Sequence, residues 1–245
     1  MMTVRSLLFN VGFIVITIVW ALLCVFVVPL PYRWRYGFIS GWAIVNLWWL
    51  RITCGITHDV KGVENIPDRA CVVLSKHQST WETLFFVAYL PPMAYILKRE
   101  LLFVPFFGWG LALTEPIAID RRSGRKAVQS IIETGTRLLR LGRWIVVFPE
   151  GTRIAAGHKG RYGVGGAVLA ERSGFPVLPV AHNGGELWPR RSFVKKTGVI
   201  TVVFGELMET EGLSAEQVNR QSERWIESTM VQISRVPYPA AEQKN

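Results

Sequence analysis

The chain has 245 residues, a formal net charge of +10, and 50% hydrophobic residues against 19% charged ones. The apolar content excludes an intrinsically disordered protein, and the 22 glycines, 13 prolines and 3 cysteines exclude a collagen-like chain or a disulfide scaffold. The length allows one domain of ordinary size with an additional segment.

The hydrophobic residues are concentrated at the start of the chain. Residues 1–50 contain no acid, and their only charged side chains are Arg5, Arg33 and Arg35. The rest of the chain has the charged fraction of an ordinary globular domain and a positive balance. We therefore expect an N-terminal membrane anchor of two apolar helices at residues 1–55, an α/β domain at residues 56–236, and a polar tail at residues 237–245.

The first apolar run, residues 13–30, is longer than the apolar core of a signal peptide, and no small-residue cleavage pattern follows it. We interpret it as a retained membrane helix, with a buried helix of a soluble protein as the alternative. A second run, residues 36–50, is short for a membrane span, and its tryptophans suit an interfacial helix. Pro29 and Pro31 would mark the turn of a two-helix hairpin. The pattern leaves open whether the first helix crosses the bilayer.

The excess of Lys and Arg over Asp and Glu in the globular part indicates on which side of a membrane it lies. Lys- and Arg-rich segments stay on the cytoplasmic side of a membrane, and positive charge favours an anionic lipid surface. We therefore expect this part on the cytoplasmic side of the inner membrane. Zinc-finger spacing, an aromatic RNA-binding motif and a long basic run are all missing, so we expect no nucleic-acid partner. Cys24, Cys54 and Cys71 lack C-x-x-C spacing, which predicts reduced thiols and no metal site.

Short apolar runs alternate with segments of helical periodicity after residue 55. This alternation predicts an α/β fold, a mixed sheet flanked by helices. The expected strands are residues 71–74, 94–97, 117–119, 144–148, 176–180 and 199–204, and the expected helices are residues 123–141, 162–172 and 214–235. Ser214 and Gln217 form a capping box at the start of the last helix.

A possible acid–base pair follows the first of these strands, in the segment SKHQSTWET. Loops at the carboxyl edge of a sheet are where α/β domains place active sites. His77 suits proton transfer near neutral pH, and a carboxylate such as Glu82 on its other ring nitrogen would fix the tautomer and stabilise the imidazolium. The alternative is that Ser79 or Thr80 caps a helix and Glu82 complements its dipole.

Cations follow three other strands. The segment Pro-Glu-Gly-Thr-Arg ends at Arg153, which can hold a phosphate by charge-assisted hydrogen bonds. Lys98 and Arg121 stand at two further strand ends. Ordinary turns with solvated charges are the alternative. His182 lies in a Gly-rich segment, and we interpret it as structural.

Taken in order, these segments resemble the glycerolipid acyltransferase family, and within it the enzymes that acylate 1-acyl-sn-glycerol-3-phosphate. The resemblance covers about residues 57–205, and its most specific block is residues 148–153. It implies transfer of a fatty acyl group from acyl-CoA or acyl-carrier protein to the free hydroxyl of a lysophosphatidate-like lysophospholipid at a membrane. A thioester is already activated, so no metal or other cofactor is expected.

The resemblance also assigns roles to individual residues. The motif His, here His77, is the general base, and the acid five residues later, here Glu82, supports it. Arg121 and Arg153 stand at the positions taken to hold the acceptor phosphate. The other residues to which the resemblance assigns substrate binding are Lys98, Glu150, Gly151 and Thr152.

Two positions depart from the family's pattern. Its acid is usually Asp, so Glu82 adds a methylene, and we expect the role to survive. Relatives often carry a Lys where this chain has Gly163, and Lys159 or Arg161 is expected to supply that charge. The second departure leaves the acceptor open, with lyso-ornithine lipid and lysocardiolipin as alternatives.

Two other classes of function fit parts of the sequence. A membrane lipid-binding protein or scaffold without catalysis would explain the anchor, but the four motif residues His77, Glu82, Glu150 and Arg153 are intact. A hydrolase would also use a His and an acid, but the G-x-S-x-G nucleophile motif is absent.

Overall fold

The computed structural model describes residues 1–120 and 123–239. Within them, one mixed sheet has the strand order β1-β7-β6-β2-β5-β3-β4, in which only β6 and β7 are antiparallel neighbours. The predicted mixed α/β fold is confirmed. The strands are β1 (Ile56–Lys61), β2 (Val72–Ser75), β3 (Met93–Lys98), β4 (Ile117–Ile119), β5 (Trp144–Val147), β6 (Val177–His182) and β7 (Gly198–Phe204).

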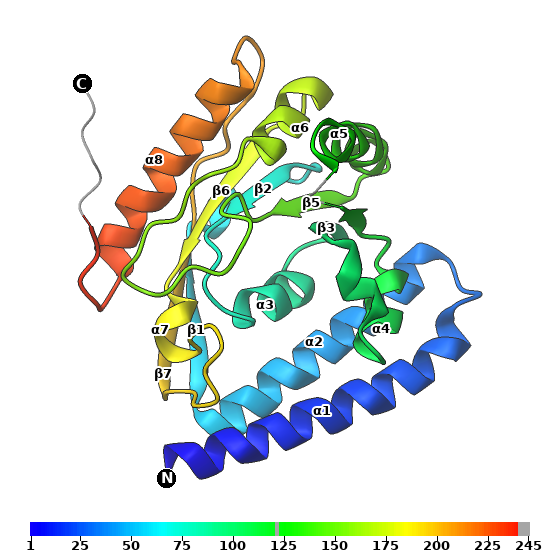
Figure 1. Cartoon of the computed structure of the whole chain (residues 1–245), viewed down its shortest axis with the longest axis vertical. Helices are drawn as coiled ribbons and strands as arrows, with labels where there is room; N and C mark the ends of the chain where they lie inside the picture. Colours follow the sequence, from blue (N-terminus) through cyan, green and yellow to red (C-terminus); the bar gives the residue numbers. More distant parts are fainter. Residues whose placement is uncertain (121–122, 240–245) are drawn as a thin grey trace.

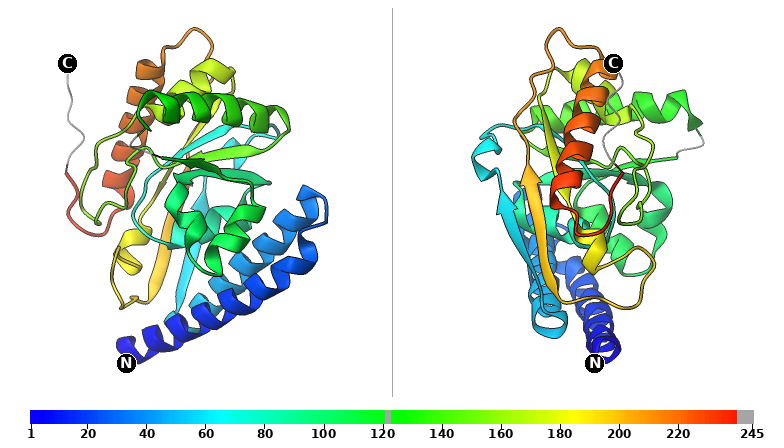
Figure 2. Two further views of the ribbon diagram at one scale, coloured as in Figure 1. Left: turned by 45° about the vertical axis from the view of Figure 1, so that its right-hand side comes forward. Right: turned by 90° about the vertical axis from the view of Figure 1, so that its left-hand side faces the viewer.

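Helices cover both faces of the sheet (Figure 1). α5, α6 and α8 lie on one face, while α3 lies on the other, between the sheet and α2 (Figures 1 and 2). The α-helices are α1 (Met2–Val27), α2 (Tyr32–Cys54), α3 (Trp81–Tyr89), α4 (Phe107–Leu113), α5 (Arg125–Arg140), α6 (Gly165–Ser173), α7 (Gly184–Leu187) and α8 (Ala215–Ile233), and short 3-10 helices are η1 (Val63–Asn65) and η2 (Arg99–Phe103).

The two N-terminal helices form a hairpin whose turn contains Pro29 and Pro31, as predicted. Their packing is close because Gly12 has no side chain where the Trp49 ring of α2 approaches. The Trp42 indole N–H of α2 donates to Thr17 Oγ1 of α1 at 3.2 Å. α2 in turn contacts α3, where Ser40 Oγ donates to a backbone carbonyl at 3.0 Å. The hairpin is therefore part of the packed structure and covers the α3 side of the sheet.

α1 is, within the described ranges, the one helix long and apolar enough to cross a membrane. Only 11% of its most apolar window is buried. A helix that exposes so much apolar surface does not suit the interior of a soluble protein.

The strand β2 is the centre of the sheet, since β5 and β6 pair with it on either side. All four of its side chains are buried. The chain leaves β2 at Lys76 and enters the loop that precedes α3. The carboxyl ends of β2, β3 and β5 therefore meet at one edge of the sheet, where the predicted motifs follow.

Candidate active site

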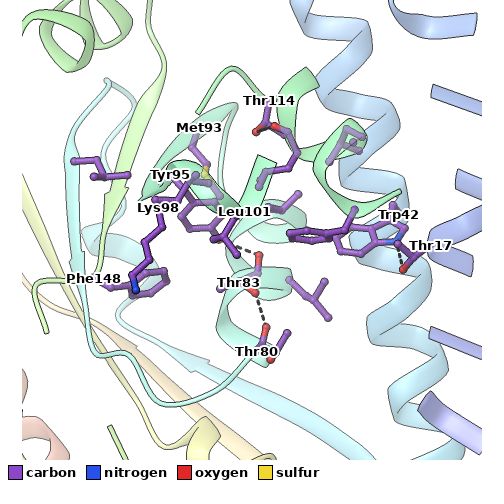
Figure 3. A pocket seen from close by; sticks show the side chains of 18 of the residues that line it. Thr17, Trp42, Thr80, Thr83, Met93, Tyr95, Lys98, Leu101, Thr114 and Phe148 are labelled. Carbon is purple, nitrogen blue, oxygen red and sulfur yellow. Dashed lines mark hydrogen bonds between the residues drawn. The ribbon is translucent and has the colours of Figure 1, made fainter. Parts of the chain in front are cut away.

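A cavity of about 660 Å³ lies between the sheet edge and the helical hairpin (Figure 3). Most of its wall is apolar and comes from α1, α2, α3, β3 and α4. Figure 3 shows the Trp42 ring of α2 on one side and Lys98, beside the Phe148 ring, on another. The polar and charged wall residues at strand ends or in loops include His77, Thr80, Lys98, Thr152, Arg153, Arg190 and Arg191.

His77 and Glu82 are brought together at this cavity. His77 Nδ1 lies 2.9 Å from Glu82 Oε1, and the Glu82 side chain is fully buried while His77 is 14% exposed. An ionised carboxylate only accepts hydrogen bonds, so Nδ1 carries the proton and Nε2 keeps its lone pair. This tautomer allows Nε2 to accept a proton from a bound molecule.

The His77 ring is also held from its face. It stacks on the Phe148 ring with 4.0 Å between centroids and 14° between planes. The Phe148 ring in turn stacks on Tyr95, with centroids 5.8 Å apart. The hydrogen bond and the stacking together fix the orientation of the imidazole before any substrate binds.

Glu82 also stabilises the start of α3. Its Oε1 accepts the backbone N–H groups of Gln78 and Ser79, each at 2.8 Å. Burial alone would raise the pKa of Glu82, but the hydrogen bonds from the His77 ring and the Ser79 N–H hold the pKa below its usual value. The carboxylate therefore acts both as a helix cap and as the partner of His77.

His182 stabilises the loop between β2 and α3 that carries His77. It is fully buried, its Nε2 donates to the Lys76 carbonyl at 2.8 Å, and its Nδ1 accepts the Gly184 N–H at 3.2 Å. Burial lowers the pKa of His182 and favours the neutral ring that these two bonds require. Its contacts are structural, and it is not among the residues that line the cavity.

A buried ion-pair network lies behind His77. Lys76 Nζ contacts Glu150 Oε1 at 2.7 Å and Glu227 Oε1, from α8, at 2.9 Å. Glu150 Oε2 accepts the His77 backbone N–H at 2.9 Å. Burial raises the pKa of Glu150, and the Lys76 charge opposes that shift. Glu150 thus holds the backbone of His77 and is not among the residues that line the cavity, and the substrate-binding role implied by the resemblance stays a prediction.

Two tyrosines complete the hydrogen bonding of Glu227. The Tyr162 hydroxyl donates to Oε1 at 2.7 Å, and the Tyr238 hydroxyl donates to Oε2 at 2.6 Å. Tyr238 belongs to the segment expected to be a polar tail, and here it is packed against the domain. α8 and the chain after it are therefore connected to the loop that carries His77.

The Pro-Glu-Gly-Thr-Arg segment forms a tight loop beside His77. Gly151 adopts φ 67°, which favours glycine, and its N–H donates to the Phe148 carbonyl at 2.9 Å. The Ile154 N–H donates to the His77 carbonyl at 2.7 Å. Gly151, Thr152 and Arg153 all line the cavity, so this loop brings Arg153 close to the imidazole.

Of the other cations predicted to bind substrate, some line the cavity and others do not. Lys98 lines the cavity, while Arg121 lies outside the described residues. Lys159, one candidate for the missing family Lys, pairs with Glu223 of α8 at 2.9 Å, and neither it nor Arg161 lines the cavity.

Sequence reasoning missed several residues that the structure places here. Lys76 and Glu227 form the buried network, Phe148 stacks on the imidazole, and Arg190 and Arg191 line the cavity. Lys76 and Phe148 were visible as neighbours of the motifs. For the described part of the chain, no cluster of three or more His, Cys, Asp or Glu side chains could hold a metal ion.

Comparisons with known proteins identify similar sequences. A family model described as Acyltransferase matches residues 57–183. A 1-acyl-sn-glycerol-3-phosphate acyltransferase of Pseudomonas aeruginosa is 44% identical over 96% of this chain and 95% of its own. The human 1-acyl-sn-glycerol-3-phosphate acyltransferase beta is 27% identical over 81% of this chain and 73% of its own.

A solved structure has the same fold. The crystal structure of the 1-acyl-sn-glycerophosphate (LPA) acyltransferase PlsC from Thermotoga maritima matches with a TM-score of 0.79 and 24% identity, over 95% of this chain and 97% of that one. The match includes the region of the two N-terminal helices, since it covers nearly the whole chain.

Proposed function

The chain belongs to the acyltransferase family, and we propose that it transfers a fatty acyl group from an acyl thioester to the free hydroxyl of lysophosphatidate, which yields phosphatidic acid. The acceptor is the one named for the similar proteins from Pseudomonas aeruginosa and human. Acyl-CoA and acyl-carrier protein are the two donors of this chemical class. No metal or other cofactor takes part in this scheme.

The observation that carries the proposal is the imidazole of His77, oriented by the buried Glu82, in the wall of a largely apolar cavity. His77 Nε2 removes the proton of the acceptor hydroxyl while the hydroxyl oxygen attacks the thioester carbonyl carbon. Glu82 stabilises the resulting imidazolium. When the tetrahedral intermediate collapses, the carbon–sulfur bond breaks and the imidazolium returns its proton to the leaving thiolate.

The cavity suits the acyl chain of the donor. Apolar and aromatic side chains of α1, α2, α3, β3 and α4 form most of its wall, and burial of an alkyl chain there stabilises binding by about 0.8 kcal/mol per methylene. The thioester carbonyl would then stand near His77, where the polar part of the wall begins.

Arg153 is the residue that we assign to the acceptor phosphate, with Lys98 as a second cation. Both line the cavity, and the Arg153 loop is hydrogen-bonded to the His77 backbone. A guanidinium binds a phosphate through two parallel hydrogen bonds, which positions the neighbouring hydroxyl for attack.

The membrane is the proposed location, because both lipids partition there. α1 exposes hydrophobic side chains along its whole length, and tryptophans are exposed on α2 and α4. Exposed tryptophans are typical of the membrane interface, and the basic domain would face the cytoplasm at the inner membrane. The exposed side chains include Leu7, Val11, Ile14, Val19, Leu22, Phe26, Trp34, Trp48 and Trp109.

The direct test is turnover by the purified full-length protein with a panel of lysolipids and both thioester donors, with the products identified by mass spectrometry. We expect lysophosphatidate to be acylated in preference to lyso-ornithine lipid and lysocardiolipin. His77→Ala should lower kcat by about 10²–10⁴-fold. His58→Ala, which removes an imidazole of β1 that is not part of the cavity wall, is the matched control and should retain activity. Near wild-type turnover by the His77 variant would contradict the general-base role.

A further inference from the structure

Two arginines in the cavity wall have no role in the scheme above. Arg190 and Arg191 lie in the loop between α7 and β7, and both line the same cavity as His77. No carboxylate in residues 1–120 or 123–239 pairs with either guanidinium. Other arginines do have such partners, as Arg143 has in Glu115. The cavity therefore contains unneutralised positive charge at a place distinct from the motif residues.

The loop that carries this arginine pair is firmly attached to α1. Lys195 is almost completely buried, its backbone N–H donates to Ser6 Oγ at 2.9 Å, and its Nζ donates to Asn10 Oδ1 at 2.7 Å. The Trp188 ring packs edge-on against Phe9, with centroids 5.1 Å apart. These contacts hold both ends of the short segment that contains the two arginines.

The arginine pair and Arg153 are carried by different loops of the cavity wall. Arg153 follows β5 in a loop that is hydrogen-bonded to the backbone of His77. The arginine pair instead follows Trp188, which contacts Phe13 of α1 with 6.4 Å between centroids. Phe13 is itself part of the cavity wall. Among the described cations of the cavity wall, Lys98 ends β3 and Arg153 follows β5, while the arginine pair is in the loop attached to α1.

The proposed reaction brings two phosphate-bearing molecules to this cavity. In the acceptor, the phosphate is on the carbon next to the reacting hydroxyl, so it must bind close to His77, where Arg153 lies. In the donor, a long pantetheine arm separates the thioester from its phosphate, so that phosphate must bind at some distance. A single cation site cannot satisfy both distances.

We propose that Arg190 and Arg191 form a second phosphate subsite, which binds the phosphate at the end of the pantetheine arm of the acyl thioester donor. This inference rests on the proposed function. Acyl-CoA and acyl-carrier protein both present a phosphate there, and a guanidinium pair suits it through bidentate hydrogen bonds. The headgroup phosphates of the bilayer offer the same chemistry, so the experiment must separate donor from membrane.

The test compares Arg190→Gln/Arg191→Gln with the wild type, using donors with and without phosphate. We expect the double variant to raise the KM for acyl-CoA by about 10-fold or more, because charge-assisted hydrogen bonds are lost. The KM for the same acyl chain on pantetheine, which has no phosphate, should be unchanged. The KM for lysophosphatidate should also be unchanged, whereas Arg153→Gln should raise it. The double variant Arg140→Gln/Arg224→Gln removes equal charge from exposed positions outside the cavity and is the control.

Any other result of these measurements would contradict the proposed phosphate subsite. A raised KM for lysophosphatidate would place the acceptor phosphate at the arginine pair. Weaker binding to vesicles of anionic phospholipid, with unchanged KM for both donors, would make the arginine pair a membrane contact. Equal effects on acyl-CoA and acyl-pantetheine would indicate a general disturbance of the site. If the wild type used no thioester donor at all, the proposed function itself would fail, which is a distinct result.

Discussion

Oε1 of Glu82 accepts hydrogen bonds from the His77 ring and from two backbone N–H groups that precede α3. From the sequence, Glu82 could either support a catalytic His77 or stabilise the start of a helix. In the structure its carboxylate is placed to do both. The longer side chain of Glu, compared with the Asp that is usual in the family, still brings the oxygen to 2.9 Å from Nδ1. Glu82 therefore reaches the imidazole, and the expectation that it keeps its catalytic role stays a prediction.

Neutralising Glu82 should slow the reaction much more than it weakens binding. In Glu82→Gln the side chain keeps its size but no longer stabilises an imidazolium, so we expect kcat to fall by about 10²–10⁴-fold with little change in either KM. Glu82→Asp keeps the charge but shortens the reach, and it should lose less. Steady-state kinetics measure both variants, and a Gln variant as active as the wild type would contradict the role of the carboxylate.

The pH dependence of the unfolding free energy should reveal the lowered pKa of Glu82. The pKa of Glu82 is held below its ordinary value of 4.5, so folding gains stability from the ionised form at any pH above that value. This gain is lost as the pH falls through the lower pKa of the folded state. The contribution of the ionised carboxylate to the difference in unfolding free energy between wild type and Glu82→Gln should therefore persist above pH 4.5 and shrink below it. Chemical unfolding at several pH values measures it, and a difference that shrinks between pH 7 and 6 would argue against a lowered pKa.

At the scale of elements, α8 supports the loop that carries His77. Glu227 of α8 contacts Lys76, and Lys76 contacts Glu150, whose other oxygen holds the His77 backbone N–H. The network joins the beginning, middle and end of the domain. Such pairing across the whole domain is what a buried lysine requires, because an unpaired buried charge is strongly destabilising.

Glu227→Gln should disturb both stability and catalysis although Glu227 does not line the cavity. Removing one partner of a buried ion pair costs about 3–5 kcal/mol. The displaced Lys76 loop should also lower kcat. Glu223→Gln is the matched control, since Glu223 is on the same helix and pairs with Lys159 near the surface, where such pairs contribute about 0–1 kcal/mol. Thermal unfolding and turnover of the two variants should differ clearly, and equal small effects would show that the network is not needed.

The sequence predicted the buried strands and the local pair of His77 and Glu82 well, but it did not predict β1 or a contact between distant residues. The buried strands were recognisable as apolar runs, and the pairing of His77 with Glu82 spans only five residues, so local patterns sufficed. β1 was missed because its sequence, ITHDVK, is largely polar, as suits an edge strand that pairs only with β7. The contact of Lys76 with Glu227 was also missed, because it joins residues 151 positions apart and leaves no periodic signal.

At the scale of the whole molecule, the N-terminal hairpin is both the proposed membrane contact and a wall of the cavity. Phe13 and Thr17 of α1 and Trp42 of α2 line the cavity, while the opposite side of α1 is exposed. The positively charged side chains are likewise found both inside the protein or its cavity and on its exposed surface. Lys76 and Lys195 are buried with polar partners inside the protein, and Lys98, Arg153 and the arginine pair line the cavity. Exposed arginines such as Arg140 and Arg224 are available to an anionic surface.

The double role of the hairpin predicts that its internal packing controls activity independently of membrane binding. A Cβ atom at Gly12 would lie 2.0 Å from Trp49 Nε1, so Gly12→Val must push α1 away from α2, at a cost of about 1–3 kcal/mol. The exposed apolar face of α1 is unchanged by this substitution. We therefore expect lower thermal stability and lower turnover, with vesicle binding retained. Gly37→Val is the control, because Gly37 is on α2 with no atom within 4 Å of its Cβ position. Parallel loss of vesicle binding and turnover in the Gly12 variant alone would mean that the hairpin acts only as an anchor.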